Sequence, residues 1–236
     1  MKNIIKSPII YKKYNITIFP NPYKHKIKID IHLQWNTAFF FHYKNKTSQM
    51  RLYLIREEVL KNIPKYKANP YDLHINIRSG DVFLKVIHHM YSQPPLCFYK
   101  KIINECNYKH IFILSNGHEN PVVDKLLNSY RKIKYIHGSV EFDISIIVNT
   151  YNLVMPVSTF TSTLFQLNNN LRNLYIYELY KFNFKNFKYT LHKMIPSDKY
   201  INMMKGKWKK SKEQIDLMLN ERCINNRIEH IYPKIL

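Results

Sequence analysis

The fold is decided by the range Tyr71–Asp81, which reads YDLHINIRSGD. Its apolar middle, Leu73–Ile77, is typical of a β-strand, and Gly80 predicts that the chain turns directly after that strand. Gly117 and Gly138 also follow short apolar runs. In an open parallel sheet the chain turns sharply where each strand ends, and ligands bind in the crevice beyond these carboxyl ends. We therefore expect the segment after this first strand to be a ligand-binding loop.

Strand and helix patterns alternate over the following hundred residues. Strands are expected at Leu73–Ile77, Ile111–Leu114, Ile133–Ile136, Leu153–Val157 and Leu174–Tyr177. Helices are expected between them, beginning near Pro94, Pro121, Val140 and Thr161. Such alternation predicts βαβ units with right-handed crossovers, so that the strands form a parallel sheet. The sequence therefore predicts an α/β, Rossmann-like fold.

Three parts are expected along the chain. Residues 1–69 form a short N-terminal attachment, residues 70–180 form the Rossmann-like domain, and residues 181–236 form a basic helical tail that packs on the domain. In the tail, Ser211 and Gln214 match a helix capping box. In the attachment, strand-like pieces and one helix are expected at Asn15–Phe19, Lys26–His32, Ala38–His42 and Met50–Asn62.

The composition is that of a globular protein with an unusual charge. Of the 236 residues, 45% are hydrophobic and 22% are charged, which excludes a disordered chain. The net charge of +21 attracts polyanions, whether nucleic acid, an acidic membrane surface or a phosphorylated small molecule. Abundant Lys, Asn, Ile and Tyr with scarce Gly and Ala are also what an AT-rich genome imposes on any protein. The charge by itself therefore does not choose between these partners.

Targeting signals and metal-binding patterns are not found in the sequence. Cys97, Cys106 and Cys223 show no metal spacing and no paired framework, and such a sparse, odd count is typical of a reducing compartment. Lysines interrupt Met1–Phe19, which lacks the apolar core of a signal peptide. No stretch approaches the roughly twenty apolar residues of a membrane span. We expect a cytoplasmic or soluble protein with no transmembrane segment and no metal site.

The first candidate site is the end of the strand that the opening stretch predicts. Strand geometry places Asn76 and Arg78 on one face. An arginine at this position can meet a phosphate with a forked pair of charge-assisted hydrogen bonds. Ser79 and the backbone around Gly80 add further donors, while Asp81 can hold the arginine in place, accept a hydrogen bond or act as a base. Taken alone, Arg78–Asp81 is also typical of an ordinary turn with an ion pair.

Two later segments carry further candidate residues. The range Ser158–Thr163 holds five hydroxyls at a strand end where a helix begins, and helix N-termini bind phosphate through unpaired N–H groups. One or two of these hydroxyls are accounted for as ordinary helix caps. Asp143 lies in the preceding helix, where an acidic residue in a first turn is also favoured by the helix dipole alone.

In this order, the motifs resemble the nucleotide-sugar half of the α-1,2/α-1,6-fucosyltransferase superfamily, over Tyr71–Tyr177. That family shows a His-x-Arg-x-Gly-Asp-like motif at a strand end, and later an Asp followed by a Ser/Thr-Phe-Ser segment. The resembling segments are Asn76–Asp81, Gln93–Tyr99, Phe112–Asn116, Asn120–Leu126, Asp143 and Asn152–Phe160.

The resemblance implies a GT-B glycosyltransferase that moves fucose from GDP-fucose to a glycan or protein hydroxyl. It implies inversion at the anomeric carbon, no cofactor and no essential metal. By match, Arg78 would contact the β-phosphate of the donor and Asp143 would hydrogen-bond the guanine. Ser158 and Thr159 would hold the diphosphate. The expected substrate-binding set also includes Asn76, Ser79, Gly80 and Thr161.

Catalysis of transfer requires two groups at this site. Negative charge grows on the departing nucleotide diphosphate, and a preorganised Arg78 suits its stabilisation. The acceptor hydroxyl needs a base. Asp81, Glu119 and Glu141 are the candidates for that base, and the sequence does not choose between them.

Two other functions remain open. A nucleic-acid-binding protein would use the +21 charge and the nineteen tyrosines on one basic-aromatic face. The basic cluster Lys207–Lys210 around Trp208 could serve it, but we interpret this cluster as a solvated helix edge. A catalytically silent relative would bind a nucleotide sugar without transferring it. Asn76, which stands where the family motif has histidine, and the short N-terminal part favour that second alternative.

Overall fold

The computed structural model describes residues 9–11, 16–18, 60–61, 63–84, 87–181, 187–223 and 228–233. In the N-terminal attachment, β1 (Ile9–Tyr11) pairs antiparallel with β2 (Ile16–Ile18), and β2 falls within the strand expected there. The expected strands Lys26–His32 and Ala38–His42 lie outside the described residues, as does most of the helix expected at Met50–Asn62.

The domain is built on a seven-stranded sheet with the order β5-β4-β3-β6-β7-β8-β9. Its strands are β3 (Asp72–Asn76), β4 (His110–Leu114), β5 (Ile133–Ile136), β6 (Asn152–Met155), β7 (Asn173–Tyr177), β8 (Thr190–Met194) and β9 (Ile228–Ile231). All neighbours pair in parallel except β9, which runs antiparallel to β8. The chain starts in the middle of the sheet, extends to one edge, and returns to fill the other side. This order is that of a Rossmann-like fold and confirms the expected α/β class.

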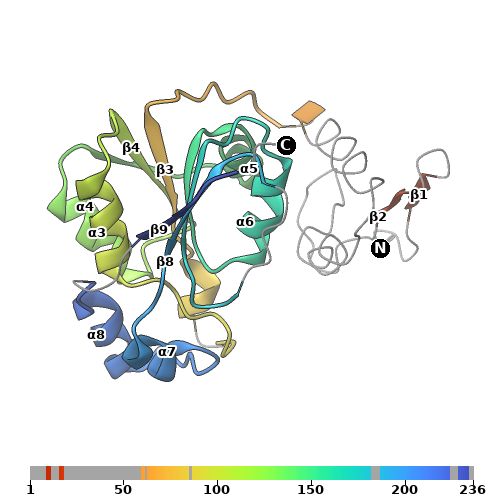
Figure 1. The fold of residues 1–236 in the computed structure, drawn as a ribbon. Coiled ribbons are helices and arrows are strands. Elements are labelled where there is room, and N and C mark those ends of the chain that lie inside the picture. The colour runs from red at the N-terminus through yellow and green to blue at the C-terminus, as the bar shows by residue number, and fades with distance from the viewer. Residues whose placement is uncertain are drawn as a thin grey trace.

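Helices cover both faces of the sheet. They are α3 (Leu96–Glu105), α4 (Pro121–Ser129), α5 (Val140–Asn149), α6 (Thr159–Leu164), α7 (Asp198–Met204) and α8 (Lys212–Asn220), with short 3-10 turns η2 (Gly80–Phe83) and η3 (Phe165–Leu167). Figure 1 shows α3 and α4 on one side of the sheet and α5 and α6 on the other. The right-handed crossover rule requires this change of face, because the chain reverses its direction across the sheet after β5.

Strand alternation divides the core between the two faces. In β7, Tyr175 and Tyr177 pack with α3 and α8, whereas Leu174 and Ile176 pack with α5 and α6. Because both faces are covered, the parallel strands read as nearly continuous apolar runs rather than as alternating ones. Those runs are what made the strands recognisable in the sequence.

Local signals determine where the helices begin. The Asn120 side chain accepts a hydrogen bond from Val122 N (3.0 Å) and caps α4, whose first residue is Pro121. Ser211 and Gln214 form the expected capping box at the start of α8. These short-range interactions satisfy backbone N–H groups that have no partner within the helix.

The C-terminal tail is more than the expected set of helices. Residues 181–236 do contribute α7 and α8, but they also add β8 and β9 to the same sheet. The domain therefore does not end near residue 180. β8 pairs in parallel with all five residues of β7, which makes β7 an interior strand rather than the edge of the sheet.

The prediction that no cysteines are paired is wrong. Cys97, in the first turn of α3, forms a disulfide with Cys223, three residues after α8, while Cys106 is free. The two partners are 126 residues apart in the chain, so only the tertiary fold brings them together. Disulfides are typical of oxidising compartments.

In the described part of the chain, every helix is too short or too polar to span a lipid bilayer.

Candidate functional site

The candidate site lies where the strand order reverses. β3 is hydrogen-bonded to β4 on one side and to β6 on the other, so the chain leaves the middle of the sheet in opposite directions after these strands. In open α/β sheets, the crevice beyond the carboxyl ends at this point is where ligands bind. The two candidate segments follow β3 and β6 directly, and the hydroxyl of Thr161 donates to Oδ1 of Asn76 across 3.3 Å. Segments 85 residues apart are thus brought together at one edge of the sheet.

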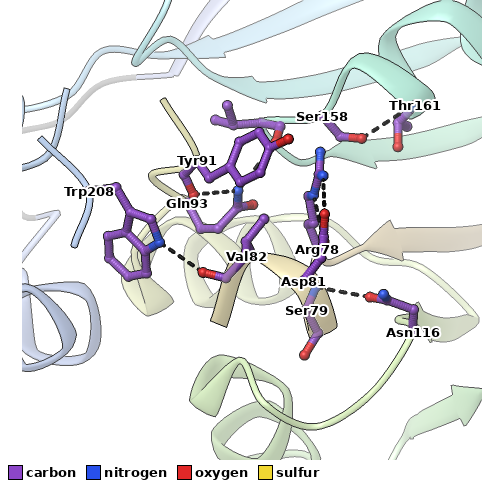
Figure 2. Close-up of polar contacts among 11 residues, drawn as sticks. Arg78, Ser79, Asp81, Val82, Tyr91, Gln93, Asn116, Ser158, Thr161 and Trp208 are labelled. Atoms are coloured by element: carbon purple, nitrogen blue, oxygen red, sulfur yellow. Dashed lines mark hydrogen bonds and ion pairs between the residues drawn. The ribbon is translucent and has the colours of Figure 1, made fainter. Parts of the chain in front are cut away.

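Arg78 is held as an oriented cation at this edge. Its Nη2 lies 2.8 Å from Oδ2 of Asp81, and its Nε donates to Oδ1 of the same carboxylate across 3.4 Å. The guanidinium also stacks on the ring of Tyr91, 4.4 Å from the ring centre. Only 13% of the Arg78 side chain is exposed, against 56% for Asp81. Figure 2 shows the guanidinium pointing from β3 toward the turn that carries Ser158 and Thr161.

The loop after Arg78 is braced by the loop between β4 and α4. Ser79 N donates to Oδ1 of Asn116 (3.1 Å), as Figure 2 shows, and Ser79 Oγ donates to Oε2 of Glu119 (2.9 Å). The same Glu119 oxygen accepts from Gly80 N (3.1 Å). Ser79 and Gly80 were expected to donate to a ligand. In the structure the Ser79 N–H and hydroxyl and the Gly80 N–H donate within the protein and hold the loop.

Glycine is required at position 80. Its φ is +55°, and a Cβ there would lie 2.5 Å from Nδ2 of Asn116. A side chain would be strained by the backbone and would collide with the residue that braces Ser79. The glycine is therefore needed for the sharp turn that presents Arg78.

The acidic candidates for a base differ in their surroundings. Hydrogen bonds from its own backbone N–H, from the Ser79 hydroxyl and from Gly80 N lower the pKa of Glu119. The pKa of Glu141 is lowered by hydrogen bonds from its own backbone N–H and from Ser139. Both carboxylates are thus occupied by local donors. Asp81 is engaged by Arg78 alone among the interactions described and is more than half exposed.

The turn after β6 uses most of its hydroxyls locally. Ser158 caps α6 by accepting from Thr161 N (3.4 Å), and the Ser162 and Thr163 hydroxyls both donate to the Thr159 carbonyl (3.0 Å each). Thr159 itself is exposed. Of the hydroxyls expected to bind phosphate, Ser158 is therefore first a helix cap, and the side chain of Thr159 faces solvent.

Asp143 has a buried oxygen without a partner. It lies in the first turn of α5, which Ser139 caps by accepting from Phe142 N (3.3 Å). Oδ1 of Asp143 is buried and has no hydrogen-bond partner. Burial raises the pKa of Asp143 to about 6, against a smaller opposing effect of His137. A carboxylate that is costly to the fold in this way is a common mark of a functional site.

Asp143 is not in contact with Arg78. It follows β5, which is separated from β3 by β4, so two strand spacings of about 5 Å lie between them. Both residues nevertheless lie at the same carboxyl edge of the sheet. At this separation, Asp143 and Arg78 could contact the two ends of one extended ligand but not the same ligand atom.

Three residues of the site were not expected from the sequence. Tyr91 is the ring beneath Arg78, and the buried Gln93 amide donates to the carbonyls of Tyr91 (3.0 Å) and Val157 (3.3 Å). Gln93 therefore links the loop after β3 to the strand end of β6, and its Oε1 is buried without a partner. Trp208 reaches the same loop from the tail. The resemblance included Gln93 in one of its segments, and Trp208 was noted only as part of a basic cluster with a different role.

The interpretation of Trp208 as part of a solvated helix edge is wrong. Its side chain is 1% exposed, and Nε1 donates to the Val82 carbonyl across 2.9 Å (Figure 2). The lysines on either side, Lys207 and Lys209, are exposed as expected. A charged run around one aromatic residue gives no sign of where that residue packs, because the packing partner is distant in the sequence.

Within the described ranges, no three His, Cys, Asp or Glu side chains are grouped so that they could hold a metal ion. Comparison of the chain with models of known protein families, with curated proteins and with solved structures finds no match.

Proposed function

We propose that the protein is a glycosyltransferase of the GT-B type that moves a sugar, fucose, from GDP-fucose to a glycan or protein hydroxyl. The observation that carries the proposal is the partly buried Arg78 cation at the reversal of strand order, facing the turn after β6. The order of motifs that resembles fucosyltransferases supports the same function. The mechanism proposed is inverting and independent of metal.

Arg78 suits a diphosphate because its position is fixed while its ion pair is replaceable. Tyr91 and the braced loop hold the guanidinium, whereas the Asp81 carboxylate is exposed and its attraction is screened by water. A phosphate offers the same forked pairing with more charge. Binding would exchange one anion for another without moving the cation. Thr159, exposed at the neighbouring turn, is placed to add a hydroxyl donor.

Asp143 suits a guanine base. Its unpartnered Oδ1 needs a donor, and the Watson–Crick edge of guanine presents two adjacent N–H donors to a carboxylate. Adenine presents an acceptor where guanine has its ring N–H, and uracil presents a single N–H between two carbonyl acceptors, so neither offers two adjacent donors. Two strand spacings separate Asp143 from Arg78, which is compatible with an extended nucleoside diphosphate between base and phosphates. Asp143 is therefore the residue that we expect to select GDP.

The same geometry supports separate catalytic roles for Arg78 and Asp81. Arg78 would stabilise the charge that grows on the departing GDP, in a position set before the substrate arrives. Once phosphate replaces Asp81 on the guanidinium, the Asp81 carboxylate is free to accept the proton of the acceptor hydroxyl. Of the three acidic candidates, we propose Asp81 as the base, because local donors already occupy Glu119 and Glu141.

The experiment that tests the function is GDP binding by isothermal titration calorimetry with the Arg78→Ala variant. A hydrogen bond to a charged group contributes roughly 1.5–3 kcal/mol to binding, so its loss should lower the affinity for GDP by about 10- to 100-fold. The matched control is Arg172→Ala, because Arg172 also stacks on a tyrosine, Tyr151, at 4.8 Å. It precedes β7 and so lies at the amino edge of the sheet. Both variants lose one positive charge, but only Arg78→Ala should weaken binding.

A result in which both variants bind GDP like the wild type would remove the assignment of Arg78. Stabilisation of the wild type by UDP or ADP as strongly as by GDP, in a thermal-shift panel, would remove the choice of donor. GDP binding with no release of GDP from GDP-fucose in the presence of acceptor glycans would favour the catalytically silent alternative.

A further inference from the structure

One turn of the C-terminal tail forms several hydrogen bonds with the loop that follows Arg78. The turn runs from Met204 to Ser211, between α7 and α8, and the loop is described over residues 80–84 and 87–92. Figure 1 shows α7 and α8 together at one end of the molecule. The contacts between turn and loop join residues more than a hundred positions apart in the chain.

The turn holds the loop at both of its ends. The indole Nε1 of Trp208 donates to the Val82 carbonyl (2.9 Å), and its ring packs edge-on against Phe83 at 5.5 Å. The backbone N of Trp208 donates to the His89 carbonyl across 3.0 Å. Trp208 therefore contacts η2, which contains Asp81, and also the segment that leads to Tyr91. Asp81 and Tyr91 are the two partners of the Arg78 guanidinium.

Two further contacts repeat the same connection. The Lys210 ammonium donates to the Phe83 carbonyl, and the Ser92 hydroxyl donates to the Met204 carbonyl. Each contact ties one end of the loop to one end of the turn. A single accidental contact would not show this pairing.

The turn is itself rigid. Gly206 and Lys210 both have a positive φ, +69° and +55°, and such backbone persists in a non-glycine residue only where surrounding interactions hold it. The buried amide of Gln214 supplies these interactions. Its Nε2 donates to the carbonyls of Met203 (3.0 Å) and Lys207 (2.8 Å), and its Oε1 accepts from Lys209 N (2.9 Å).

We propose that Trp208 is a positioning residue for the anion site: its indole N–H holds η2 and its backbone N–H holds the segment that leads to Tyr91, so that Asp81 and Tyr91 orient the Arg78 guanidinium before a ligand binds. The inference rests on the proposed function for its ligand, a nucleoside diphosphate. Its physical basis is that a backbone carbonyl in a short 3-10 turn would otherwise be buried without a donor, and a loop with such a group does not keep one conformation. The tail would thus support the proposed donor site through the loop rather than through contacts with the ligand.

The test compares Trp208→Phe with Tyr108→Phe. The first change keeps a ring in the core but removes the N–H donor. The second removes the hydroxyl that contacts Tyr175 OH at 2.7 Å, at the amino end of β4 on the opposite edge of the sheet. Hydrogen exchange is measured on the unliganded proteins, and GDP affinity is measured by calorimetry at a temperature where both variants are folded. Trp208→Phe should speed amide exchange in residues 79–84 and weaken GDP binding about tenfold, corresponding to about one hydrogen bond.

A second variant keeps the inference testable if Trp208→Phe does not fold. Lys210→Met removes the ammonium contact with Phe83 from an exposed side chain, and it should change exchange and affinity in the same direction by a smaller factor. Unchanged exchange in residues 79–84 overturns the inference, as does an equal effect of Tyr108→Phe. If the wild-type protein does not bind GDP, the proposed function fails, and the exchange comparison alone decides whether Trp208 positions the loop.

Discussion

Asp143 carries a cost that the fold alone does not explain. A buried carboxylate oxygen with no partner weakens the native state unless the group is protonated, which is why burial raises its pKa to about 6. An asparagine of the same shape would avoid the charge. A residue that keeps such a cost is expected to use it in binding or catalysis.

The prediction for Asp143→Asn concerns stability as a function of pH. The folded-state pKa, about 6, lies above the unfolded value of 3.8, so the stabilising contribution of the protonated carboxyl is complete below 3.8 and is lost as pH rises through 6. The asparagine variant should therefore be more stable than the wild type at pH 7.5, by about 1–2 kcal/mol after allowance for solvent screening. Urea unfolding at pH 7.5 and at pH 3.5 measures the difference, which should disappear at the lower pH. GDP binding should weaken in the same variant, and a destabilised variant at pH 7.5 would contradict the argument.

His74 illustrates a buried titratable group with a structural role. Its Nε2 lies 2.7 Å from Tyr66 OH and its Nδ1 lies 2.6 Å from Thr150 Oγ1, with the ring stacked on Phe112. Both nitrogens are used by the neutral ring. Burial lowers the pKa of His74 to about 4.

The prediction for His74 is a loss of pH dependence. Between pH 6.5 and pH 4 the unfolded chain takes up a proton at this residue and the folded protein does not, so the free energy of unfolding falls as pH falls, by roughly 3 kcal/mol. His74→Gln should lower stability at pH 7 and flatten this slope, measured by urea unfolding across the window. His89→Gln, at an exposed position, is the control and should keep the slope. An unaltered slope in His74→Gln would show that other groups produce it. Burial, with a smaller effect of His230, lowers the pKa of His192 to about 4 as well. His192 should therefore produce the part of the pH dependence that remains in His74→Gln.

At the scale of elements, the most consequential connection is between α3 and α8. The Cys97–Cys223 disulfide joins the chain just after α8 to the first turn of α3, the helix that follows the Arg78 loop. The Trp208 turn lies immediately before α8. The cross-link therefore restrains the same region of the tail that contacts the candidate site.

The prediction for the disulfide is a large loss of stability on reduction. A disulfide that closes a loop of this length lowers the entropy of the unfolded chain, and in the chain-entropy description it raises the free energy of unfolding by up to about 5 kcal/mol. Cys97→Ser should lower the thermal midpoint, and dithiothreitol should lower it in the wild type but not in that variant. Cys106→Ser is the matched control, because Cys106 is free and should tolerate the change. Titration of three free thiols in the denatured, unreduced protein would show that the pair is not formed.

At the scale of the whole molecule, the net charge of +21 acts on every anionic ligand. Such a charge attracts nucleotides and nucleic acids to many surface positions, with an affinity that falls as salt is added. The comparison between the Arg78 and Arg172 variants is independent of this effect, since both have the same net charge. That comparison therefore tests the geometry of the candidate site rather than the net charge.

The central strands and their helices could be predicted from the sequence because their signals are local. Apolar runs, the glycines that follow them and helix caps such as Asn120 and Ser211 act over a few residues. The position of Asn76, Arg78 and Asp81 at a strand end could be predicted for the same reason, since a strand end with an arginine and a turn is visible in the chain.

The contacts of that site could not be predicted in the same way. Tyr91 beneath Arg78, Gln93 across to Val157 and Trp208 onto Val82 each join segments whose spacing in the chain carries no information on their distance in space. The same reason explains why the sequence did not show that Ser79 and Gly80 brace the loop through Asn116 and Glu119. Their partners lie in another loop.

The sequence alone determined the class of the fold, the order of its central elements and the residues that stand at the strand ends, because periodicity and turn residues act at short range. Only the tertiary structure decided which strand ends are neighbours, that the C-terminal tail completes the sheet and holds the Arg78 loop, and that Cys97 meets Cys223. Those outcomes depend on how two faces of one sheet are covered. The free energy of burying those faces is shared among all the elements that pack there, and no single stretch of chain contains it.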